Sequence, residues 1–434
     1  MHVVLVADHA YVNGGQAKVA LDSALGLAAR GVRVTLFAAC GPADPRLAAA
    51  GIRVVCLNQD DVSTTRNKLA FLVQAIWNGE AARRLAAELA LCDPRDTVVH
   101  VHAFAKALSP SIGVALRRSG LALVYTLHEF FLVCPNGGFY EYPAAAICRR
   151  TPMSRACLTT DCDAKSYPRK LARVVRHVGM TRIARLPTIF RHVVTISDLQ
   201  ERVVAPLLPR GTTFHRVDNP ISVARAPVRE EAPGDFLFVG RISTEKGAPV
   251  FAEAARRAGI RAVFVGDGEQ RAELAARYPE AAMLGWRDAA GVQALMRQAR
   301  ALVFPSVWYE GQPLTVYEAL ACGTPVVVSD ACAGREAVID GETGFLFRSG
   351  DPDALAAHLR RLTDDALAAR MGRAAHARYW AAPLSLDAHL DRLGGVYAAV
   401  LRAGASGRPA ARPAGRGPSL ADRGRVKHSE PASR

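Results

Sequence analysis

The pattern that most constrains this chain is an alternation of short apolar runs with longer amphipathic segments. Strand-length apolar runs lie at 2–7, 32–38, 52–57, 97–101, 124–127 and 192–196, and segments with helical spacing, such as 16–30 and 80–91, separate them. Runs that are apolar throughout are typical of strands buried on both faces of a sheet. The alternation with helices therefore predicts the α/β class, built from parallel βαβ units in a doubly wound sheet.

The same rhythm begins again in the second half of the chain. Strands are predicted at 236–239, 262–265, 301–304 and 325–328, and helices at 250–258 and 268–276. The stretch 222–233 carries prolines and mixed charge, which is typical of an interdomain linker. We therefore expect one Rossmann-like domain over 1–223 and a second over 234–382, with a helix at about 383–402 that packs back on the first. The stretch 403–434 has almost no large apolar residue, which predicts a disordered basic tail.

The net charge of +15 over 434 residues suggests an anionic partner. Residues 165–191 hold eight basic and no acidic side chains, and 403–434 hold seven basic against two acidic ones, so these stretches carry +13 of the +15. The apolar residues among the cations of 165–191 follow a helical pattern, which favours an anionic membrane surface; the alternative is a solvated helix. A nucleic-acid-binding protein is the weaker interpretation of the charge, because no basic-aromatic motif or known binding module supports it.

Three glycine-bearing turns follow predicted strands in the second half, at Gly240, at 266–268 and at Gly311. Glycine lets backbone N–H groups approach a phosphate, although an ordinary left-handed turn also needs glycine. Arg241 and Lys246 flank the first of these turns, and two fixed cations at a strand end suit a diphosphate.

Two glutamates, Glu310 and Glu318, stand eight positions apart in the segment that follows. A loop glutamate and a second one about two helical turns later can lie on one rim, where their carboxylates would accept hydrogen bonds from sugar or ribose hydroxyls. The alternative is a surface glutamate and a first-turn glutamate that favours the helix dipole.

The segments FVGRISTEKG, VGDGEQ, MLGW, FPSVWYEGQPLTVYEALACGTPVVVSD and REAVIDGETGFLF occur in this order. Together they resemble the retaining, nucleotide-sugar-dependent glycosyltransferases of family four, and the resemblance extends over about residues 1–402. It implies the GT-B fold, in which two Rossmann-like doubly wound domains face a cleft. It also implies a hexosyltransferase that moves a sugar from a nucleoside diphosphate sugar to an acceptor, in the synthesis of a glycan, a glycolipid or a polysaccharide of a bacterial cell envelope. A sugar-nucleotide epimerase of the same fold is the alternative.

The resemblance also implies roles for single residues and requires no cofactor for catalysis. Arg241 and Lys246 would neutralise the donor diphosphate, and Glu310 would hold the donor sugar together with the backbone amides of 311–314. His128, in the segment TLHEF, would be a further catalytic residue in the cleft, and Glu129 stands beside it where many relatives carry aspartate. The donor-binding residues implied are Gly14, Gly15, Gly240, Gly266, Asp267, Gly268, Gly311, Gln312, Pro313, Leu314 and, for the ribose, Glu318.

Four of the nine cysteines crowd into one segment, at Cys134, Cys148, Cys157 and Cys162. The segment lacks the short CxxC pairs of common zinc modules. A structural zinc ion or a disulfide-linked insertion near the acceptor side is one hypothesis, and four free thiols are the other. The first ten residues lack a basic stretch followed by an apolar core, so we expect no signal peptide and a cytoplasmic protein that associates with the inner face of the cell membrane.

Overall fold

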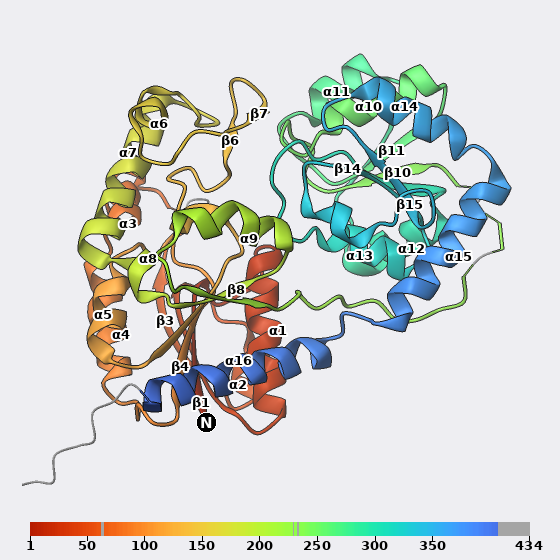
Figure 1. The fold of residues 1–434 in the computed structure, drawn as a ribbon. Coiled ribbons are helices and arrows are strands. Elements are labelled where there is room, and N and C mark those ends of the chain that lie inside the picture. The colour runs from red at the N-terminus through yellow and green to blue at the C-terminus, as the bar shows by residue number, and fades with distance from the viewer. Residues whose placement is uncertain (62–64, 229, 232–233, 407–434) are drawn as a thin grey trace, which may run out of the picture.

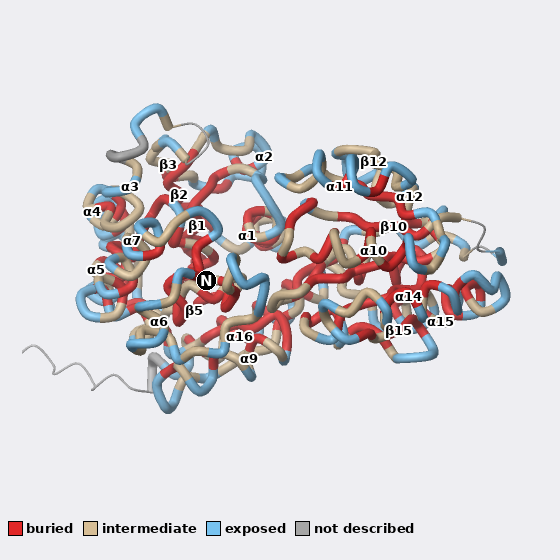
Figure 2. Tube along the Cα trace, turned by 90° about the horizontal axis from the view of Figure 1, so that it is seen from above, coloured by how far each residue is buried: buried red, intermediate tan, exposed pale blue. Residues whose placement is uncertain are grey.

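The chain forms two α/β domains that stand side by side (Figure 1). The computed structural model describes residues 1–61, 65–228, 230–231 and 234–406. Each domain has its own parallel sheet and its own buried interior, which Figure 2 shows as two separate regions of buried chain. The predicted α/β class and the two Rossmann-like halves are therefore confirmed, and the predicted tail beyond residue 406 lies outside the described residues.

The N-terminal sheet has seven parallel strands in the order β3-β2-β1-β4-β5-β8-β9. Successive strands are added on one side of the sheet from β1 to β3 and on the other side from β4 to β9. The direction of the strand order therefore reverses between β1 and β4. Ligands of open α/β sheets bind at the carboxyl ends of the strands at such a reversal. The strands are β1 (His2–His9), β2 (Arg33–Cys40), β3 (Arg53–Gln59), β4 (Thr97–Val101), β5 (Ala122–Thr126), β8 (His192–Thr195) and β9 (Thr213–Arg216).

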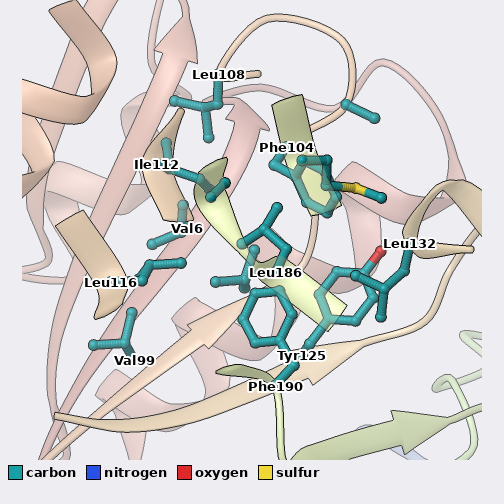
Figure 3. Packing of buried hydrophobic residues seen from close by; sticks show 14 of the residues in the cluster. Val6, Val99, Phe104, Leu108, Ile112, Leu116, Tyr125, Leu132, Leu186 and Phe190 are labelled. Carbon is teal, nitrogen blue, oxygen red and sulfur yellow. The ribbon is translucent and has the colours of Figure 1, made fainter. Parts of the chain in front are cut away.

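Helices cover both faces of this sheet. On one face lie α1 (Gly15–Ala29) and α16 (Leu386–Ser406), and they bury a cluster that includes Leu21, Leu393 and Tyr397. On the other face lie α4 (Gly79–Leu89), α5 (Ile112–Ser119) and α8 (Leu186–Ile189). Figure 3 shows the packing there, where Val99 and Tyr125 of the sheet meet side chains of α5 and α8. Further helices of the domain are α2 (Pro45–Ala49), α3 (Lys68–Ile76), α9 (Asp198–Val204) and the 3-10 turn η3 (Ala205–Leu207).

The segment between β5 and β8 departs from the simple βα alternation. It contains η1 (Phe130–Leu132), the short strands β6 (Tyr140–Glu141) and β7 (Ala146–Ile147), α6 (Arg155–Thr159), α7 (Tyr167–Val178) and the π-helix η2 (Gly179–Ala184). In Figure 1 the β6–β7 hairpin extends from the N-terminal domain towards the second domain. We call residues 130–184 the insertion.

The C-terminal sheet has six parallel strands in the order β12-β11-β10-β13-β14-β15. Its strands are β10 (Phe236–Val239), β11 (Ala262–Val265), β12 (Ala282–Gly285), β13 (Ala301–Phe304), β14 (Val326–Ser329) and β15 (Gly344–Phe347). Its helices are α10 (Ala248–Ala258), α11 (Arg271–Arg277), α12 (Ala289–Gln298), α13 (Leu314–Ala321), η4 (Ala333–Ala337), α14 (Pro352–Arg361) and α15 (Asp365–Ala381). Phenylalanines of β10, β11 and α10 fill one face, and helices α12, α13 and α15 cover the other.

The chain passes between the domains twice, once after β9 and once between α15 and α16 (Figure 1). The second passage returns α16 to the N-terminal sheet, where it packs against α1, β4 and β5. Among the described residues, no helix combines the length and the apolar composition that crossing a membrane requires.

Candidate functional site: the cleft between the two domains

A cavity of about 390 Å³ lies between the domains and is lined by residues of both. From the N-terminal domain come the turn after β1, the turn after β5 and the start of the insertion; from the C-terminal domain come the turn after β10 and the segment 308–315. Of the predicted site residues, the cavity lining includes Gly15, His128, Gly240, Arg241, Lys246, Glu310, Gly311, Gln312, Pro313 and Leu314. The structure therefore brings together residues that are up to 299 positions apart in the chain.

Two helices begin at this cavity from opposite sides. Helix α1 starts at Gly15 and helix α13 starts at Leu314, and a β-carbon on Gly15 would lie only 3.7 Å from Leu314 Cδ1. The exposed Gly14 precedes α1 and has no side chain that could obstruct access to it. Since the N-terminus of a helix carries partial positive charge and unpaired N–H groups, the two starts form a region that favours an anion.

The turns after β10 and β11 pack directly on each other, which explains their glycines. Gly240 has a φ of 153° and Gly266 a φ of 135°, a region that other residues rarely adopt. A β-carbon on Gly266 would lie 2.0 Å from the Gly240 carbonyl oxygen, and one on Gly268 would lie 2.2 Å from the Ile242 carbonyl oxygen. Asp267 accepts a hydrogen bond from the Gly268 N–H at 2.8 Å. Gly266, Asp267 and Gly268 do not line the cavity, so their nucleotide-binding role stays a prediction.

Lys246 and Glu310 form an ion pair inside the cavity. The Glu310 carboxylate also accepts hydrogen bonds from Trp308 Nε1 at 2.7 Å and Ser306 Oγ at 3.3 Å. Burial would raise the pKa of Glu310, but Lys246 and the two hydrogen-bond donors hold that pKa below its ordinary value. Lys246 Nζ also lies 5.5 Å from the centre of the Trp308 ring. Glu310 is therefore ionised, and it holds Lys246 in place.

Arg241 is paired in a similar way with Glu245, a residue to which sequence reasoning assigned no role. The Glu245 side chain is 1% exposed, accepts a hydrogen bond from Ser243 Oγ at 2.8 Å and is the ion-pair partner of Arg241. The Arg241 side chain is 54% exposed, so its guanidinium faces the cleft while its partner is buried. The acid beside two cations in the printed sequence is the signal that could have identified Glu245.

The segment before α13 differs from the predicted donor clamp in two respects. Pro313 has no backbone N–H, so the predicted row of amides over 311–314 is wrong at this position, and Pro313 instead takes the N-cap position of α13. The Gln312 side chain accepts a hydrogen bond from the Asn219 backbone N–H at 2.6 Å, which ties the segment to the first interdomain passage. Gly311 lies against Gln200 of α9, where a β-carbon would come within 2.3 Å of Nε2. The backbone here is therefore fixed by contacts with the N-terminal domain.

Glu318 lies outside the residues that line the cavity and on the side of α13 that faces Lys18 of α1. Burial raises the pKa of Glu318, and Lys18 opposes this effect. A half-buried carboxylate without a strong ion pair is poised to accept hydrogen bonds from neutral hydroxyls, so the predicted ribose contact stays a prediction.

His128 follows β5 and lines the cavity, and two further histidines lie behind it. His102 Nδ1 lies 3.1 Å from His128 Nε2, and the rings of His100 and His102 have centroids 4.1 Å apart. Burial, and to a smaller extent the charge of His389, lowers the pKa of His128 to about 3, so His128 is neutral at pH 7. Sequence reasoning assigned no role to His102, although its place directly after a central strand puts it at the same sheet edge as His128.

The four clustered cysteines belong to the insertion, and all nine cysteines of the chain are free. Burial raises the pKa of Cys162 to about 11 against the opposing charge of Lys170, and the neighbouring thiols Cys134, Cys157 and Cys148 raise it to a smaller extent. Over the described ranges, no set of three or more His, Cys, Asp or Glu side chains is arranged to hold a metal ion. The zinc hypothesis therefore has no geometric support here, and it stays a prediction.

Buried ionic contacts hold the insertion together instead. Lys170 is 1% exposed and donates to the carbonyl oxygens of Cys157, Leu158 and Thr160 at the end of α6. Arg173 forms an ion pair with the buried Asp163 at 3.0 Å. Two of the eight cations that the sequence placed in one basic stretch thus have structural partners.

Two family models match the chain. "Glycosyl transferase 4-like domain" matches residues 14–202, and "Glycosyl transferases group 1" matches residues 233–365. The matched ranges cover most of both domains and contain all the residues that line the cavity except Asn219.

Curated relatives and solved structures agree with these models. The D-inositol 3-phosphate glycosyltransferase of Streptomyces avermitilis is 37% identical over 229 residues, which are 47% of this chain and 48% of that protein. The glycogen synthase of Mycobacterium tuberculosis is 28% identical over 299 residues, which are 62% of this chain and 70% of that protein. The chain thus spans about half the length of the first of these relatives.

Among solved structures, Anabaena HepE in complex with UDP and glucose superimposes on this chain with a TM-score of 0.63 at 16% identity. The superposition covers 92% of this chain and 100% of the HepE chain. The sucrose-phosphate synthase of Thermosynechococcus elongatus gives a TM-score of 0.64 at 19% identity, over 93% and 99% of the two chains. At these identities the likeness shows the fold alone, which is GT-B. The two matched models and this fold show that the chain belongs to the family of group 1 and 4-like glycosyltransferases.

Proposed function

We propose that the protein is a retaining hexosyltransferase that takes its sugar from a nucleoside diphosphate sugar. The observation that carries this proposal is the cavity between the domains, where two helix N-termini and the cations Arg241 and Lys246 converge. A glycosyl donor of this kind releases a diphosphate, and negative charge develops on it in the transition state. Fixed cations and helix N-termini stabilise that charge most strongly where water is excluded.

The paired glutamates give the cations a defined position before the donor arrives. Glu310 holds Lys246 and Glu245 holds Arg241 on the C-terminal side of the same cavity. A bound diphosphate would compete for both cations, which would free the Glu310 carboxylate to accept hydrogen bonds from sugar hydroxyls. His128 is neutral at pH 7, so it can donate one hydrogen bond into the cleft without repelling Arg241 or Lys246. Retention of the anomeric configuration is part of the proposal and follows the family resemblance.

A donor screen tests this proposal. Thermal unfolding is followed with a panel of nucleoside diphosphate sugars, and the configuration of the product formed from the best donor is read by NMR. We expect a rise in Tm for one donor and a product with retained configuration. Glu318→Ala should remove most of the Tm rise if Glu318 binds the ribose, whereas the exposed Glu342→Ala should leave it unchanged. An inverted product, or an epimerised nucleotide sugar without acceptor, would contradict the proposal.

For the acceptor, we propose a glycan or lipid-linked glycan of a cell envelope, presented at the inner face of a membrane to a cytoplasmic protein. One support is a relative from Escherichia coli, the UDP-Gal:alpha-D-GlcNAc-diphosphoundecaprenol alpha-1,3-galactosyltransferase, which is 33% identical over 144 residues, or 30% of this chain and 36% of that protein. The other support is the surface of the insertion. Leu171, Val175, Val178 and Ile183 of α7 and η2 are 42% to 57% exposed.

This orientation is the reverse of what an amphipathic helix on a domain surface normally shows. On α7 the polar Lys170 and His177 are buried, and the apolar residues face outward. Helix α3 packs beside α7 and adds the exposed Leu72 and Val73. The cations of 165–191 that remain exposed are Lys165, Arg169, Arg182, Arg185 and Arg191. Exposed apolar residues on α3, α7 and η2, with exposed cations in the same stretch of chain, match an anionic bilayer surface.

Sedimentation with vesicles tests the membrane proposal. Binding is measured on vesicles of phosphatidylcholine with and without phosphatidylglycerol, at low and high salt. We expect binding to the anionic vesicles that weakens with salt and is lost in Val175→Ser/Arg182→Glu. The double reversal Arg370→Glu/Arg373→Glu on α15 is the matched control, because it changes exposed charges on the other domain. Equal binding of both variants, or equal binding to uncharged vesicles, would refute the proposed surface.

A further inference from the structure

Three histidines form a buried line that runs from α16 through the N-terminal sheet to the cleft. His100 Nδ1 lies 2.7 Å from the Tyr397 hydroxyl and its Nε2 lies 2.6 Å from the Thr126 hydroxyl. His102 follows at the end of β4 and contacts His128 through the ring nitrogens at 3.1 Å. His100 and His102 are at most 1% exposed, whereas His128 reaches the cavity.

Each ring in this line carries one proton at neutral pH. Burial lowers the pKa of His100 and of His102 well below the ordinary value, and the pKa of His128 is lowered to about 3. A neutral imidazole has one nitrogen that donates and one that accepts, and the partner of one nitrogen decides which is which. The hydrogen bond between His102 and His128 therefore needs one donor and one acceptor.

The free nitrogen of His102 decides the direction of this hydrogen bond. His102 Nε2 is buried and has no hydrogen-bond partner among the residues that the structure describes. A buried N–H without a partner is rarer in proteins than a buried acceptor without one. The proton of His102 is therefore on Nδ1, which donates to His128 Nε2. His128 must then carry its own proton on Nδ1.

We infer that His102 is a positioning residue that fixes His128 as the Nδ1–H tautomer, with that N–H left to donate to an oxygen of the donor in the cleft. Two further contacts keep His102 in place. Its backbone N–H donates to the Val6 carbonyl at 2.9 Å, and its carbonyl accepts from Gln16 Nε2 at 2.7 Å. Gln16 belongs to the first turn of α1, the helix that begins at the cleft. The catalytic part of this inference rests on the proposed function, but the tautomer does not.

Two substitutions separate hydrogen bonding from packing. His102→Asn places an amide N–H near the position of Nδ1 and leaves space in the interior, whereas His102→Phe fills the space and offers no donor. If His102 acts through its hydrogen bond, His102→Phe should lower kcat by on the order of 100-fold with a smaller change in KM, and His102→Asn should recover most of this loss. If His102 only fills space, His102→Phe should be the more active variant, which would overturn the inference.

NMR on histidine-labelled protein reads the tautomer directly, without any need for activity. The ring ¹⁵N and ¹³C shifts of His128, assigned with His128→Gln, should show Nδ1–H in the native protein and a shift towards Nε2–H in His102→Phe. Tyr397→Phe is the matched control: it removes a buried hydrogen bond of His100, so it should lower Tm but leave the tautomer of His128 unchanged. A native His128 that carries its proton on Nε2 would overturn the inference, whereas a protein without any transfer activity would overturn the proposed function and leave the tautomer measurable.

Discussion

The ion pair of Lys246 with Glu310 predicts a loss of stability in Lys246→Met that depends on pH. The two side chains are 23% and 13% exposed, so the substitution leaves a largely buried carboxylate without its cation. Removing one partner of a buried ion pair lowers the free energy of unfolding by about 3–5 kcal/mol. Because both side chains of this pair keep some contact with solvent, we expect a loss at the lower end of that range, about 3 kcal/mol. With about 2–4 °C per kcal/mol for a domain of roughly 150 residues, Tm should fall by about 6–12 °C at pH 7.5.

The pH dependence follows from the pKa of Glu310 in each protein. In the native protein this pKa lies below its ordinary value, because Lys246 and two hydrogen bonds outweigh burial. The native carboxylate therefore contributes stability that is present above the unfolded pKa and is lost as pH falls through the folded pKa. In Lys246→Met the effect of burial prevails and raises the pKa of Glu310. Lowering the pH towards 5 therefore protonates Glu310, which removes the unpaired buried charge and reduces the destabilisation of the variant. The difference in Tm between the two proteins should therefore shrink as pH falls.

Calorimetry of four proteins at pH 7.5, 6 and 5 measures this effect: native, Lys246→Met, Glu310→Gln and the double variant. The double variant should recover most of the Tm, since a neutral amide can still accept the hydrogen bonds of Trp308 and Ser306. Its kcat/KM should nevertheless stay about 100-fold or more below native, because the cation that we propose to bind the donor diphosphate is missing. A loss of Tm that is equal at all pH values, or a double variant as unstable as Lys246→Met, would refute this account of the pair.

Three further predictions concern structural contacts and are read from Tm. Gly266→Ala should lower the free energy of unfolding by about 3 kcal/mol or more, because its β-carbon would lie 2.0 Å from the Gly240 carbonyl oxygen. Gly394→Ala is the control: it has open space around it in α16, so it should raise the free energy of unfolding by up to about 1 kcal/mol. Lys170→Met should lower the free energy of unfolding by about 3 kcal/mol, since three carbonyl oxygens lose their donor. It should also make the thiols of the insertion react faster with a thiol reagent. Gln312→Ala should cost about 1–2 kcal/mol through the unpaired N–H of Asn219, and an unchanged Tm would contradict that interdomain contact.

The sequence predicts the sheets well, because fully buried parallel strands leave a strong apolar signal. The predicted strand at 236–239 coincides with β10, and the one at 262–265 coincides with β11. The edge strands β9 and β12 were not predicted, since they are short and less apolar and their pairing depends on the neighbouring strand rather than on their own residues. The predicted helix at 383–402 ends later in the structure, where α16 continues to Ser406.

Some residues of the candidate site can be predicted from the sequence around them, and others cannot. Arg241 and Lys246 stand near a glycine turn, and their arrival at one cavity with Glu310 follows the order of motifs in the chain. Glu245 stands beside these two cations in the sequence and could have been identified, whereas His102 was not predictable, because its contact with His128 forms only when the two strand ends come together. The orientation of α7 was not predictable either, since a helical pattern shows which residues share a face but not which face is buried.

Some of the cations in the basic stretch 165–191 have structural partners inside the protein. Within 165–191, Lys170 neutralises the end of α6, Arg173 pairs with Asp163, and Arg176 donates to the Ala105 carbonyl at 2.6 Å. Burial lowers the pKa of Arg176 to about 10, a shift that no exposed arginine would show. Three of the eight cations thus build the insertion, and the insertion reaches the C-terminal domain, where a β-carbon on Gly138 would lie 3.2 Å from the Trp308 ring. A change in these three structural cations would therefore alter the wall of the cleft beside Glu310, whereas a change in the exposed cations would alter only the surface proposed to meet the membrane.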